Sequence, residues 1–445
     1  MRAAAVVAAS LTAALVVAWP RPAPRVVELP TGTVELHAPM VVAAGTELRG
    51  SLSGTVLHMA GDFTGPAALV VSGDGVVLRD FSIDGNRAAL EVRVGLPPSN
   101  IPFVRYTRNN GVLADGVAGL TIRSVRFRNV VGFAVLASRA RQVSIEDVEI
   151  ADSGSRDVAG RNNSTGGILL EEGTADFHVA RCHLRNVRGN GVWTHSLYTS
   201  PRNVRGVVER NTFEEIGRDA IQVGHAIDVL VENNDGRRIG FPVEDVDIEH
   251  VAVPVAIDTA GNVEGSHYVG NRFEDLDGKC IDLDGFHDGE VRANTCVNRR
   301  PPEAYRFGNY GIVMNNSNPD MQPRNIVVAE NVIEGAQFGG IFVIGTGHRI
   351  VRNRLLDLNR AHCNEETARF GCYYSAGEPD MLRSGIYLGR GAARPAPARG
   401  NVVEGNEITG YKMAARCIAR APGVEAGWNV IRGNRCAEAT AGQSR

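Results

Sequence analysis

Asp282 and Asp284 stand two residues apart in the stretch KCIDLD, residues 279–284. Alternate residues of an extended strand share one face, so both carboxylates point one way while Ile281 and Leu283 point the other. Like charges on one face destabilise a sheet unless a cation, a retained proton or solvent relieves their repulsion. Paired carboxylates are also the groups of glycoside hydrolysis, so this stretch is the first candidate site.

Two short phrases repeat along the chain and indicate how such a strand is built into the fold. One phrase is Asn, any residue, then an apolar residue; the other is a small residue, Ile or Val, any residue, then an apolar residue. Both have period two, and their recurrence about every two dozen residues is typical of a solenoid of short strands. The Asn phrase begins at Asn211, Asn271, Asn294, Asn331, Asn353, Asn406 and Asn434, and the second phrase at Gly167, Gly191, Ala220, Cys280, Gly311, Gly340 and Gly385.

These repeats favour an all-β, single-stranded right-handed parallel β-helix with long loop insertions. The phrase FSIDGNR at residues 81–87, the opening LPTGT at residues 29–33 and the repeats from Leu120 to Cys436 resemble the pectate-lyase-like superfamily of secreted β-helix proteins. The resemblance implies that the repeated Asn side chains stack and hydrogen-bond along the axis, which is a structural role. It covers nearly all of the chain after residue 18.

Composition and charge limit the function classes. The 445 residues are 43% hydrophobic and 22% charged, which suits a large core, and a net charge of −3 with scattered Arg argues against a nucleic-acid partner. Residues 1–18 combine Arg2 with an apolar run and are predicted to be a secretory signal, because the run is shorter than the ~20 residues of a membrane anchor. We expect residues 19–445 to form one secreted or periplasmic β-helix domain, monomeric and without stable membrane insertion.

The chain has seven cysteines, which fit an oxidising compartment and leave at least one unpaired. Two of them precede the Ile of the second phrase, and two others take the apolar place of the next Asn phrase, so one repeat relationship occurs twice. The alternative is that cysteine merely replaces an apolar core residue, above all at Cys296. The predicted pairs are Cys280–Cys296, Cys417–Cys436 and Cys363–Cys372, with Cys182 buried and free.

Stacked coils place equivalent residues in columns ~4.8 Å apart. If the Ile of each second phrase points inward, the residues one and three places later form two outward columns. In this register Asp258 and Asp284 stack roughly 5 Å apart on successive coils, with Asp282 about 7 Å away along the strand. The first column contains Trp193, Gln222, Asp282, Phe342 and Tyr387, and the second contains Glu171, His195, Asp258, Asp284 and Asn315.

Several reactions suit this face. Hydrolysis would use Asp258, Asp282 and Asp284 as proton donor and second carboxylate, with Lys279 beside them. A polyuronate lyase or C5-epimerase would instead remove a proton beside a neutralised carboxylate, either with no cofactor or with Ca²⁺ held by the three aspartates. His195 above Glu171 is a further acid–base couple, although an isolated surface histidine is the plainer alternative.

Substrate contacts are expected on the same face. We predict that Trp193, Phe342 and Tyr387 offer exposed aromatic faces to sugar rings, unless loops fold down and bury them. Polar contacts would come from Gln222, Asn315 and His287. The predicted rim of the groove consists of the insertions at 86–119, 236–250, 299–309 and 359–383.

Local phrases narrow the chemistry only slightly. GRDAI at 217–221 and DGKCI at 277–281 each resemble part of the Gly-Asp-Asp-Cys-Ile strand of polygalacturonases, but neither has both acids and the family's other phrases are missing. DGFHD at 284–288 resembles the Asp-Pro-His-Asp phrase of alginate C5-epimerases with one extra residue. We expect hydrolysis of an extracellular, acidic polysaccharide first, elimination or epimerisation second, and a non-catalytic glycan-binding or structural β-helix third.

Overall fold

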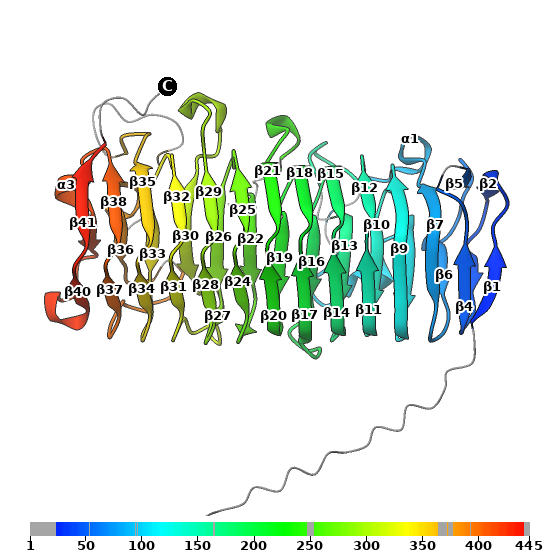
Figure 1. Ribbon diagram of the computed structural model, residues 1–445, viewed down its shortest axis with the longest axis horizontal. Helices are drawn as coiled ribbons and strands as arrows, with labels where there is room; N and C mark the ends of the chain where they lie inside the picture. Colours follow the sequence, from blue (N-terminus) through cyan, green and yellow to red (C-terminus); the bar gives the residue numbers. More distant parts are fainter. Residues whose placement is uncertain are drawn as a thin grey trace, which may run out of the picture.

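A computed structural model describes residues 24–52, 54–93, 95, 97–162, 165–246, 253–363, 372, 377–391 and 393–439. Within these residues the strands form a 13-stranded and a 28-stranded sheet, and the pairings between named strands are all parallel. Successive coils follow one another along the long axis of the molecule, from blue to red in Figure 1. The predicted parallel β-helix is confirmed.

The 13-stranded sheet carries the candidate site and takes one strand from each coil. Its strands are β3 (Met40–Val42), β6 (Ala67–Val71), β8 (Asn110–Asp115), β10 (Phe133–Ser138), β13 (Gly166–Glu171), β16 (Val192–His195), β19 (Ile221–Gly224), β22 (Val255–Ala260), β26 (Lys279–Asp284), β30 (Tyr310–Asn315), β33 (Ile341–Val343), β36 (Ile386–Leu388) and β39 (Ile418–Arg420).

The 28-stranded sheet forms the remaining walls of the solenoid. Its strands are β1 (Arg25–Glu28), β2 (Gly32–Leu36), β4 (Thr46–Arg49), β5 (Thr55–Met59), β7 (Val77–Asp84), β9 (Ala118–Arg128), β11 (Arg141–Glu146), β12 (Glu149–Ala151), β14 (Ala175–Ala180), β15 (His183–Val187), β17 (Asn203–Glu209), β18 (Thr212–Ile216), β20 (Ala226–Glu232), β21 (Asp235–Ile239), β23 (Val263–Glu264), β24 (His267–Val269), β25 (Arg272–Glu274), β27 (Phe286–His287), β28 (Glu290–Arg292), β29 (Thr295–Val297), β31 (Val327–Ala329), β32 (Val332–Glu334), β34 (Arg349–Val351), β35 (Arg354–Leu358), β37 (Val402–Glu404), β38 (Glu407–Gly410), β40 (Val430–Arg432) and β41 (Arg435–Glu438).

Helices are confined to short pieces between strands. The described helices are α1 (Arg87–Leu90), α2 (Phe103–Tyr106) and α3 (Met413–Arg416), and the 3₁₀ turns are η1 (Val243–Asp245), η2 (Pro302–Ala304), η3 (Met381–Arg383) and η4 (Ala426–Trp428).

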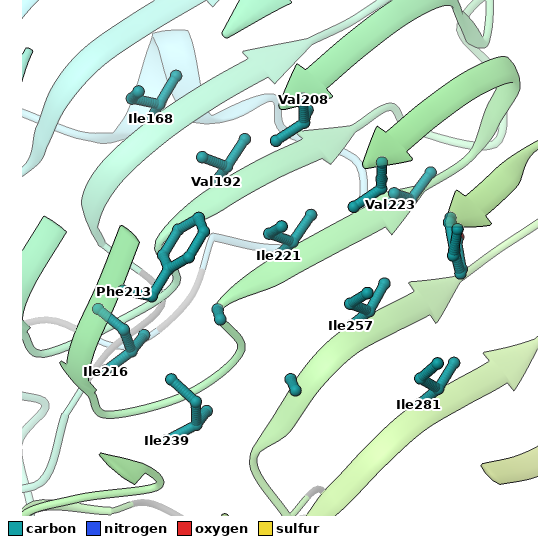
Figure 2. Packing of buried hydrophobic residues seen from close by; sticks show 14 of the residues in the cluster. Ile168, Val192, Val208, Phe213, Ile216, Ile221, Val223, Ile239, Ile257 and Ile281 are labelled. Atoms are coloured by element: carbon teal, nitrogen blue, oxygen red, sulfur yellow. The ribbon is translucent and has the colours of Figure 1, made fainter. Parts of the chain in front are cut away.

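Apolar residues at the same repeat position fill the interior. Ile221, Ile257 and Ile281 are partners in register on successive coils, and each is at most 1% exposed. Figure 2 shows this column continuing through Val192 and Ile168. The small residue before each Ile lies where coils approach closely: a Cβ at Gly167 would stand 1.7 Å from the carbonyl oxygen of Gly191. Steric exclusion therefore explains the small residue of the second phrase.

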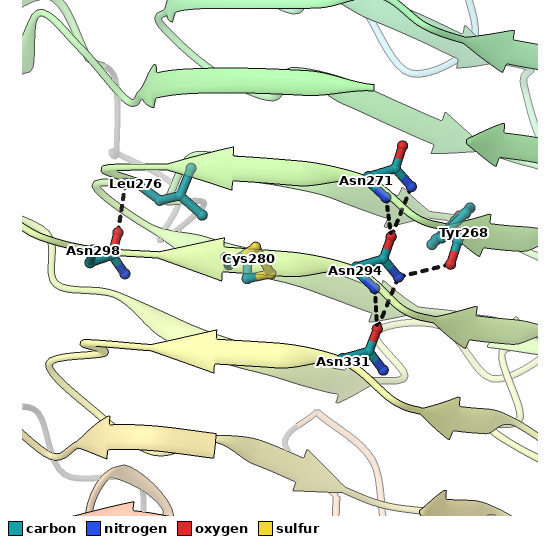
Figure 3. The surroundings of a disulfide bond; sticks show 8 residues. Tyr268, Asn271, Leu276, Cys280, Asn294, Asn298 and Asn331 are labelled. Carbon is teal, nitrogen blue, oxygen red and sulfur yellow. Dashed lines mark hydrogen bonds between the residues drawn. A yellow bond between two sulfur atoms is a disulfide. The ribbon is translucent and has the colours of Figure 1, made fainter. Parts of the chain in front are cut away.

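The repeated asparagines form one continuous hydrogen-bonded column. The Asn294 side-chain oxygen accepts bonds from both the backbone N–H (3.0 Å) and the side-chain amide (2.9 Å) of Asn271, and Asn294 donates likewise to Asn331 (Figure 3). The residue before each asparagine turns the chain with a positive φ, such as +54° at Ala293. The predicted stacking is confirmed, and Asn234 belongs to the column although Gly236 replaces the apolar residue of its phrase.

All three predicted disulfides are present, and Cys182 is free and buried as predicted. The bonds are Cys280–Cys296, Cys363–Cys372 and Cys417–Cys436. Figure 3 shows the first bond inside the coil beside the asparagine column. The backbone N–H of Cys182 donates to the Asn211 side chain at 2.9 Å, so this cysteine stands at the N-terminal end of the column.

The sequence predicts a secretory signal and no stable membrane insertion, and the described residues bear on these two predictions to different extents. The predicted signal at 1–18 lies outside the described residues and stays a prediction. None of the described helices has the length and apolarity that crossing a bilayer requires. Three disulfides are typical of proteins from oxidising, extracellular compartments.

Candidate functional site

The register of the outward columns differs from the prediction at two coils, those of β10 and β22, and the shift at β22 moves a candidate site residue. Ile257, not Val255, is the inward partner of Ile221 and Ile281, so Asp258 lies between Gln222 and Asp282 rather than above Asp284. Two apolar residues two places apart fit the same period, and sequence spacing could not choose between them. The correction moves the centre of the site to a column of Gln222, Asp258 and Asp282.

This column opens into a pocket of about 410 Å³, which we call the acid pocket. The pocket lies on the outer face of β19, β22 and β26. Its chemistry is concentrated in three carboxylates and two cations. The lining residues are Arg218, Asp219, Gln222, Val253, Pro254, Val255, Asp258, Lys279 and Asp282.

Hydrogen bonds hold each carboxylate of the acid pocket in a different way. The Gln222 amide donates to Asp258 Oδ2 at 2.5 Å, and the Val255 backbone N–H donates to Asp219 Oδ1 at 2.9 Å. Asp282 forms an ion pair with Lys279 through Oδ2, whereas its Oδ1 is buried with no hydrogen-bond partner. The pocket thus contains one amide-bound acid, one backbone-bound acid and one ion-paired acid.

Removal from water and mutual repulsion separate the protonation behaviour of these acids. Desolvation raises the pKa of Asp258 well above its usual value, and the nearby charges of Asp219 and Asp282 raise it further. Desolvation also raises the pKa of Asp219 to about 6, against the opposing effect of Arg218. A carboxyl whose pKa is raised in this way stands beside an ion-paired carboxylate, the pairing of environments that acid–base cleavage requires.

Asp284 belongs to a second pocket, which we call the histidine pocket. The Ser317 backbone N–H and hydroxyl donate to the two Asp284 oxygens at 2.8 and 2.5 Å, and desolvation raises the pKa of this acid. The pocket has a volume of about 560 Å³. Its lining residues are Trp193, His195, Ser196, Tyr198, Gly224, His225, Ala260, Gly261, Asp284, Ser317, Asn318 and Met321.

Glu171 is placed beside His195 as predicted, but it is covered. The two residues are partners in register on β13 and β16, yet Glu171 is fully buried because α2 caps it. Backbone N–H groups of Phe103 and Val104 donate to its two oxygens at 2.9 and 2.8 Å. With its pKa raised to about 7 by desolvation, Glu171 anchors the 86–119 insertion instead of facing a groove.

Calcium does not fit the predicted ligand set as it stands. Asp258 accepts from Gln222, Asp282 pairs with Lys279, and Asp284 lies in the other pocket. In the described part of the chain, the residues whose ligand atoms lie within 4.8 Å of one another are Glu171, Glu172 and His195. Four protein donors already occupy the two glutamates there.

The aromatic prediction is wrong where loops cover the sheet. Trp193 is 8% exposed and packs edge-on against Phe103 of the 86–119 insertion, although it still lines the histidine pocket. Phe342 and Tyr387 are fully buried and offer no face to a ligand. The segment containing η3 covers this end, where the carbonyl of the buried Met381 accepts from the Tyr310 hydroxyl at 3.0 Å.

Of two further polar predictions, His287 changes place and Asn315 does not. His287 lies on β27 in the 28-stranded sheet, buried between Asn262 and Asp288, because Gly285 turns the chain away from the site. Asn315 is the partner of Asp284 on the next coil, as predicted, and its side-chain oxygen accepts from the backbone N–H of residue 316.

The four insertions predicted to form the rim of the groove differ in part from that prediction. The 86–119 insertion contains α1 and α2 but also β8, and the 236–250 insertion begins inside β21. Parts of the insertions at 236–250 and 359–383 lie outside the described residues. The walls of the histidine pocket come instead from residues 196–198 and 317–321.

Asp219, His225 and Tyr198 line the two pockets although none of them was among the predicted site residues. The available signal for Asp219 was the resemblance of residues 217–221 to the polygalacturonase phrase. The positions of His225 and Tyr198 depend on the turns that follow β19 and β16, which the repeated phrases do not report.

Comparisons with known proteins agree with the architecture. Residues 104–236 match the family model described as "Right handed beta helix region", and no curated protein matches the sequence. The surface adhesin PfbA of Streptococcus pneumoniae superposes with a TM-score of 0.54 at 13% identity, covering 74% of this chain and 82% of that chain.

Two glycan-related proteins superpose as well. The GH136 lacto-N-biosidase of Eubacterium ramulus has a TM-score of 0.55 at 13% identity, covering 89% of this chain but only 62% of that chain. The tailspike protein of E. coli bacteriophage HK620, solved with a pentasaccharide, has a TM-score of 0.57 at 11% identity, covering 92% of this chain and 72% of that chain. The chain is therefore a right-handed parallel β-helix protein, with a fold shared by glycoside hydrolases, tailspikes and adhesins.

Proposed function

We propose that this protein is a secreted carbohydrate-active enzyme that hydrolyses glycosidic bonds of an extracellular polysaccharide in the acid pocket. One observation carries the proposal: three aspartates with different partners line one pocket, and desolvation with the charges of its two neighbours raises the pKa of the middle one, Asp258. A purely structural face would not concentrate carboxyl groups whose charges oppose one another. Glycan-related proteins with the same fold support the substrate class.

Each residue has a distinct role in this reaction. Asp258 gives its proton to the glycosidic oxygen as the bond to the anomeric carbon breaks. Asp282, oriented by Lys279, supplies the second carboxylate on the sugar. Gln222 positions Asp258 through its amide, and Asp219 keeps the Asp258 proton in place by repulsion. Lys279, Gln222 and Asp219 are thus positioning residues.

We take retention of configuration as the expected outcome, because the backbones of the two acids are one strand spacing apart and their side chains leave the same face. Asp258 and Asp282 each follow a paired isoleucine on neighbouring coils, which places their backbones ~4.8 Å apart. Retaining enzymes hold their carboxyl groups ~5–5.5 Å apart, whereas inverting enzymes need ~6.5–9.5 Å to admit water. Asp282 would then attack the anomeric carbon, and water would release the sugar in a second step.

Elimination is the second candidate, because the same pocket contains cations. Arg218 and Lys279 could neutralise a uronate carboxylate while an aspartate removes the neighbouring proton. Elimination creates a carbon–carbon double bond, which hydrolysis does not, so the two reactions have different products.

The test compares products over a panel of neutral and acidic polysaccharides. Hydrolysis predicts new reducing ends with no absorbance from unsaturated uronate, and ¹H NMR of the first product should show the anomer of the substrate. Asp282→Asn should lose the activity, whereas Asp176→Asn, at an exposed ion pair on the other sheet, should retain it. Absorbance that rises with the reducing ends would establish elimination, and full activity in Asp282→Asn would refute the acid pocket.

A further inference from the structure

The histidine pocket has a bare floor between two polar walls. Along the second outward column, His195 is followed on successive coils by Gly224 and Ala260, and then by Asp284. Side chains stand at both ends, but the two middle coils contribute only a hydrogen and a methyl group. A Cβ at Gly224 would lie 2.6 Å from the Thr194 carbonyl oxygen and 3.6 Å from Trp193 Nε1, so the floor is kept open by glycine.

Two loops meet above this floor. Tyr198, 53% exposed, follows β16, and Asn318 follows β30, yet the Asn318 amide donates to the Tyr198 hydroxyl at 2.7 Å. Tyr198 also packs against His225, with ring centroids 4.8 Å apart. The contact between loops from distant coils partly covers this strip of sheet and gives the open pocket an aromatic side wall.

The polar groups that line the pocket are uncharged except for one acid. His195 and His225 make no side-chain hydrogen bond within the described part of the chain, and Nδ1 of each is buried without a partner. Burial lowers the pKa of His195 to about 4 and also lowers that of His225, so both rings are neutral. A buried N–H without an acceptor is disfavoured, so the proton sits on Nε2 as a donor. Asp284 is the only carboxylate in the lining, and no Lys or Arg lines the described pocket.

We propose that the histidine pocket binds one uncharged sugar unit of the glycan and discriminates against a uronate at that position. Neutral imidazole donors and the Asp284 acceptor match sugar hydroxyls, and Tyr198 offers a face to the apolar side of the ring. A uronate would bring its carboxylate towards Asp284 in a lining that contains no Lys or Arg to pair with it.

This inference rests on the proposed function and adds the direction of the glycan. Asp282 in the acid pocket and Asp284 in the histidine pocket lie two residues apart on β26, about 7 Å along the strand. The glycan would therefore run parallel to the strands of the 13-stranded sheet rather than along the solenoid axis, with the neutral unit towards the strand ends.

The experiment uses Trp193 as a reporter inside the pocket. The chain has three tryptophans, so Trp19→Phe with Trp428→Phe leaves Trp193 as the only source of indole emission. Adding Asp258→Asn prevents cleavage and separates binding from the reaction. Titration with malto-, cello-, manno- and galactohexaose should shift the emission for at least one hexamer, and hexagalacturonate should bind at least tenfold more weakly.

Pocket variants then decide whether the signal comes from this site. Ala260→Leu fills the floor and Tyr198→Ala removes the side wall, so each should weaken binding at least tenfold. Tyr411→Ala, an aromatic residue stacked on His362 near the C-terminal end, should leave it unchanged. No response to any neutral hexamer, equal binding of hexagalacturonate, or unchanged binding in both pocket variants would each overturn the inference. Binding without any cleavage by the unmodified enzyme would refute the proposed function alone.

Discussion

The asparagine column and the column of Gln222, Asp258 and Asp282, which we call the aspartate column, both stack polar side chains at the same coil spacing. The asparagines satisfy one another's hydrogen bonds, and the two aspartates do not. Inside the coil, each asparagine from Asn211 to Asn406 both accepts from one neighbour and donates to the next. Outside, a carboxylate offers only acceptors, so Asp258 and Asp282 cannot satisfy each other. The donor or positive charge that each aspartate needs must come from Gln222, from Lys279 or from a bound proton.

This difference suggests that the asparagine column serves stability and the aspartate column serves the proposed reaction. A column that repeats one residue and closes its own hydrogen bonds adds the same stabilisation at every coil. The aspartate column appears only in the middle of the solenoid and ends at Trp193 on one side and Val313 on the other. Within it, the charge of Asp282 helps to raise the pKa of Asp258, and residues with such perturbed pKa values cluster at functional sites.

The largest expected effect comes from removing the proton donor. Asp258→Asn keeps the hydrogen-bond acceptor for Gln222 but cannot give a proton, so kcat should fall about 10³-fold, as for loss of a general acid. The free energy of unfolding at pH 7 should be unchanged or higher, because a neutral amide takes the place of a desolvated carboxyl whose ionisation is opposed there. Reducing-end assays and thermal melts on the same preparation provide the measurement; a large loss of stability would place Asp258 with the structural column.

Breaking the asparagine column should do the reverse. Asn294→Ala leaves the backbone N–H and amide of Asn271 and the carbonyl of Tyr268 without partners in the interior. Orphaned buried groups cost ~1–3 kcal/mol each, so the free energy of unfolding should fall by about 3 kcal/mol while kcat stays within twofold. Urea unfolding checks this, with Asn434→Ala as the control: the same bonds there are partly exposed, and water can replace them.

The pH dependence of the free energy of unfolding should show how far the buried Asp219 destabilises the fold. Its pKa is about 6 in the folded protein against 3.8 ordinarily, so between these values the unfolded chain has lost a proton that the folded chain keeps. The unfolded state then binds fewer protons, and the free energy of unfolding falls as pH rises, by on the order of 3 kcal/mol once the pH is above 6.

Asp219→Asn removes this titration and keeps the acceptor for the Val255 N–H. The variant should therefore melt above the unmodified protein at pH 7 and together with it near pH 3. Melting curves that stay parallel from pH 3 to pH 7 would show that Asp219 titrates normally.

Most of the fold was predictable because the sequence features that determine it recur from coil to coil. The asparagine phrase, the small residue before each inward Ile and the equivalent cysteines recur at matching places, and each recurrence tests the others. Asn234 was missed because its phrase has glycine at the apolar place.

The site was less predictable because it depends on an ambiguous register at one strand and on insertions that do not repeat. Val255 and Ile257 fit the inward pattern equally well, and a shift of two residues moved Asp258 from one column to the other. Burial of Glu171, Phe342 and Tyr387 depends on how insertions fold over the sheet, which period-two patterns do not report. The sequence located the strands that carry the two pockets, whereas loop packing decided which side chains on those strands are covered.

Chelation should have the smallest effect, and it tests whether a cation or Lys279 balances the aspartates. The Lys279 ammonium already pairs with Asp282 and lies in the pocket where a calcium ion would have to bind. A bound calcium would need several oxygen ligands at ~2.3–2.6 Å, and the Gln222 bond and the separate location of Asp284 remove two of the predicted donors. EDTA followed by dialysis should therefore leave both kcat and the melting temperature unchanged, whereas Lys279→Met should lower kcat. Loss of activity on chelation with recovery in calcium would show that the aspartates rearrange around a metal, and would favour elimination over hydrolysis.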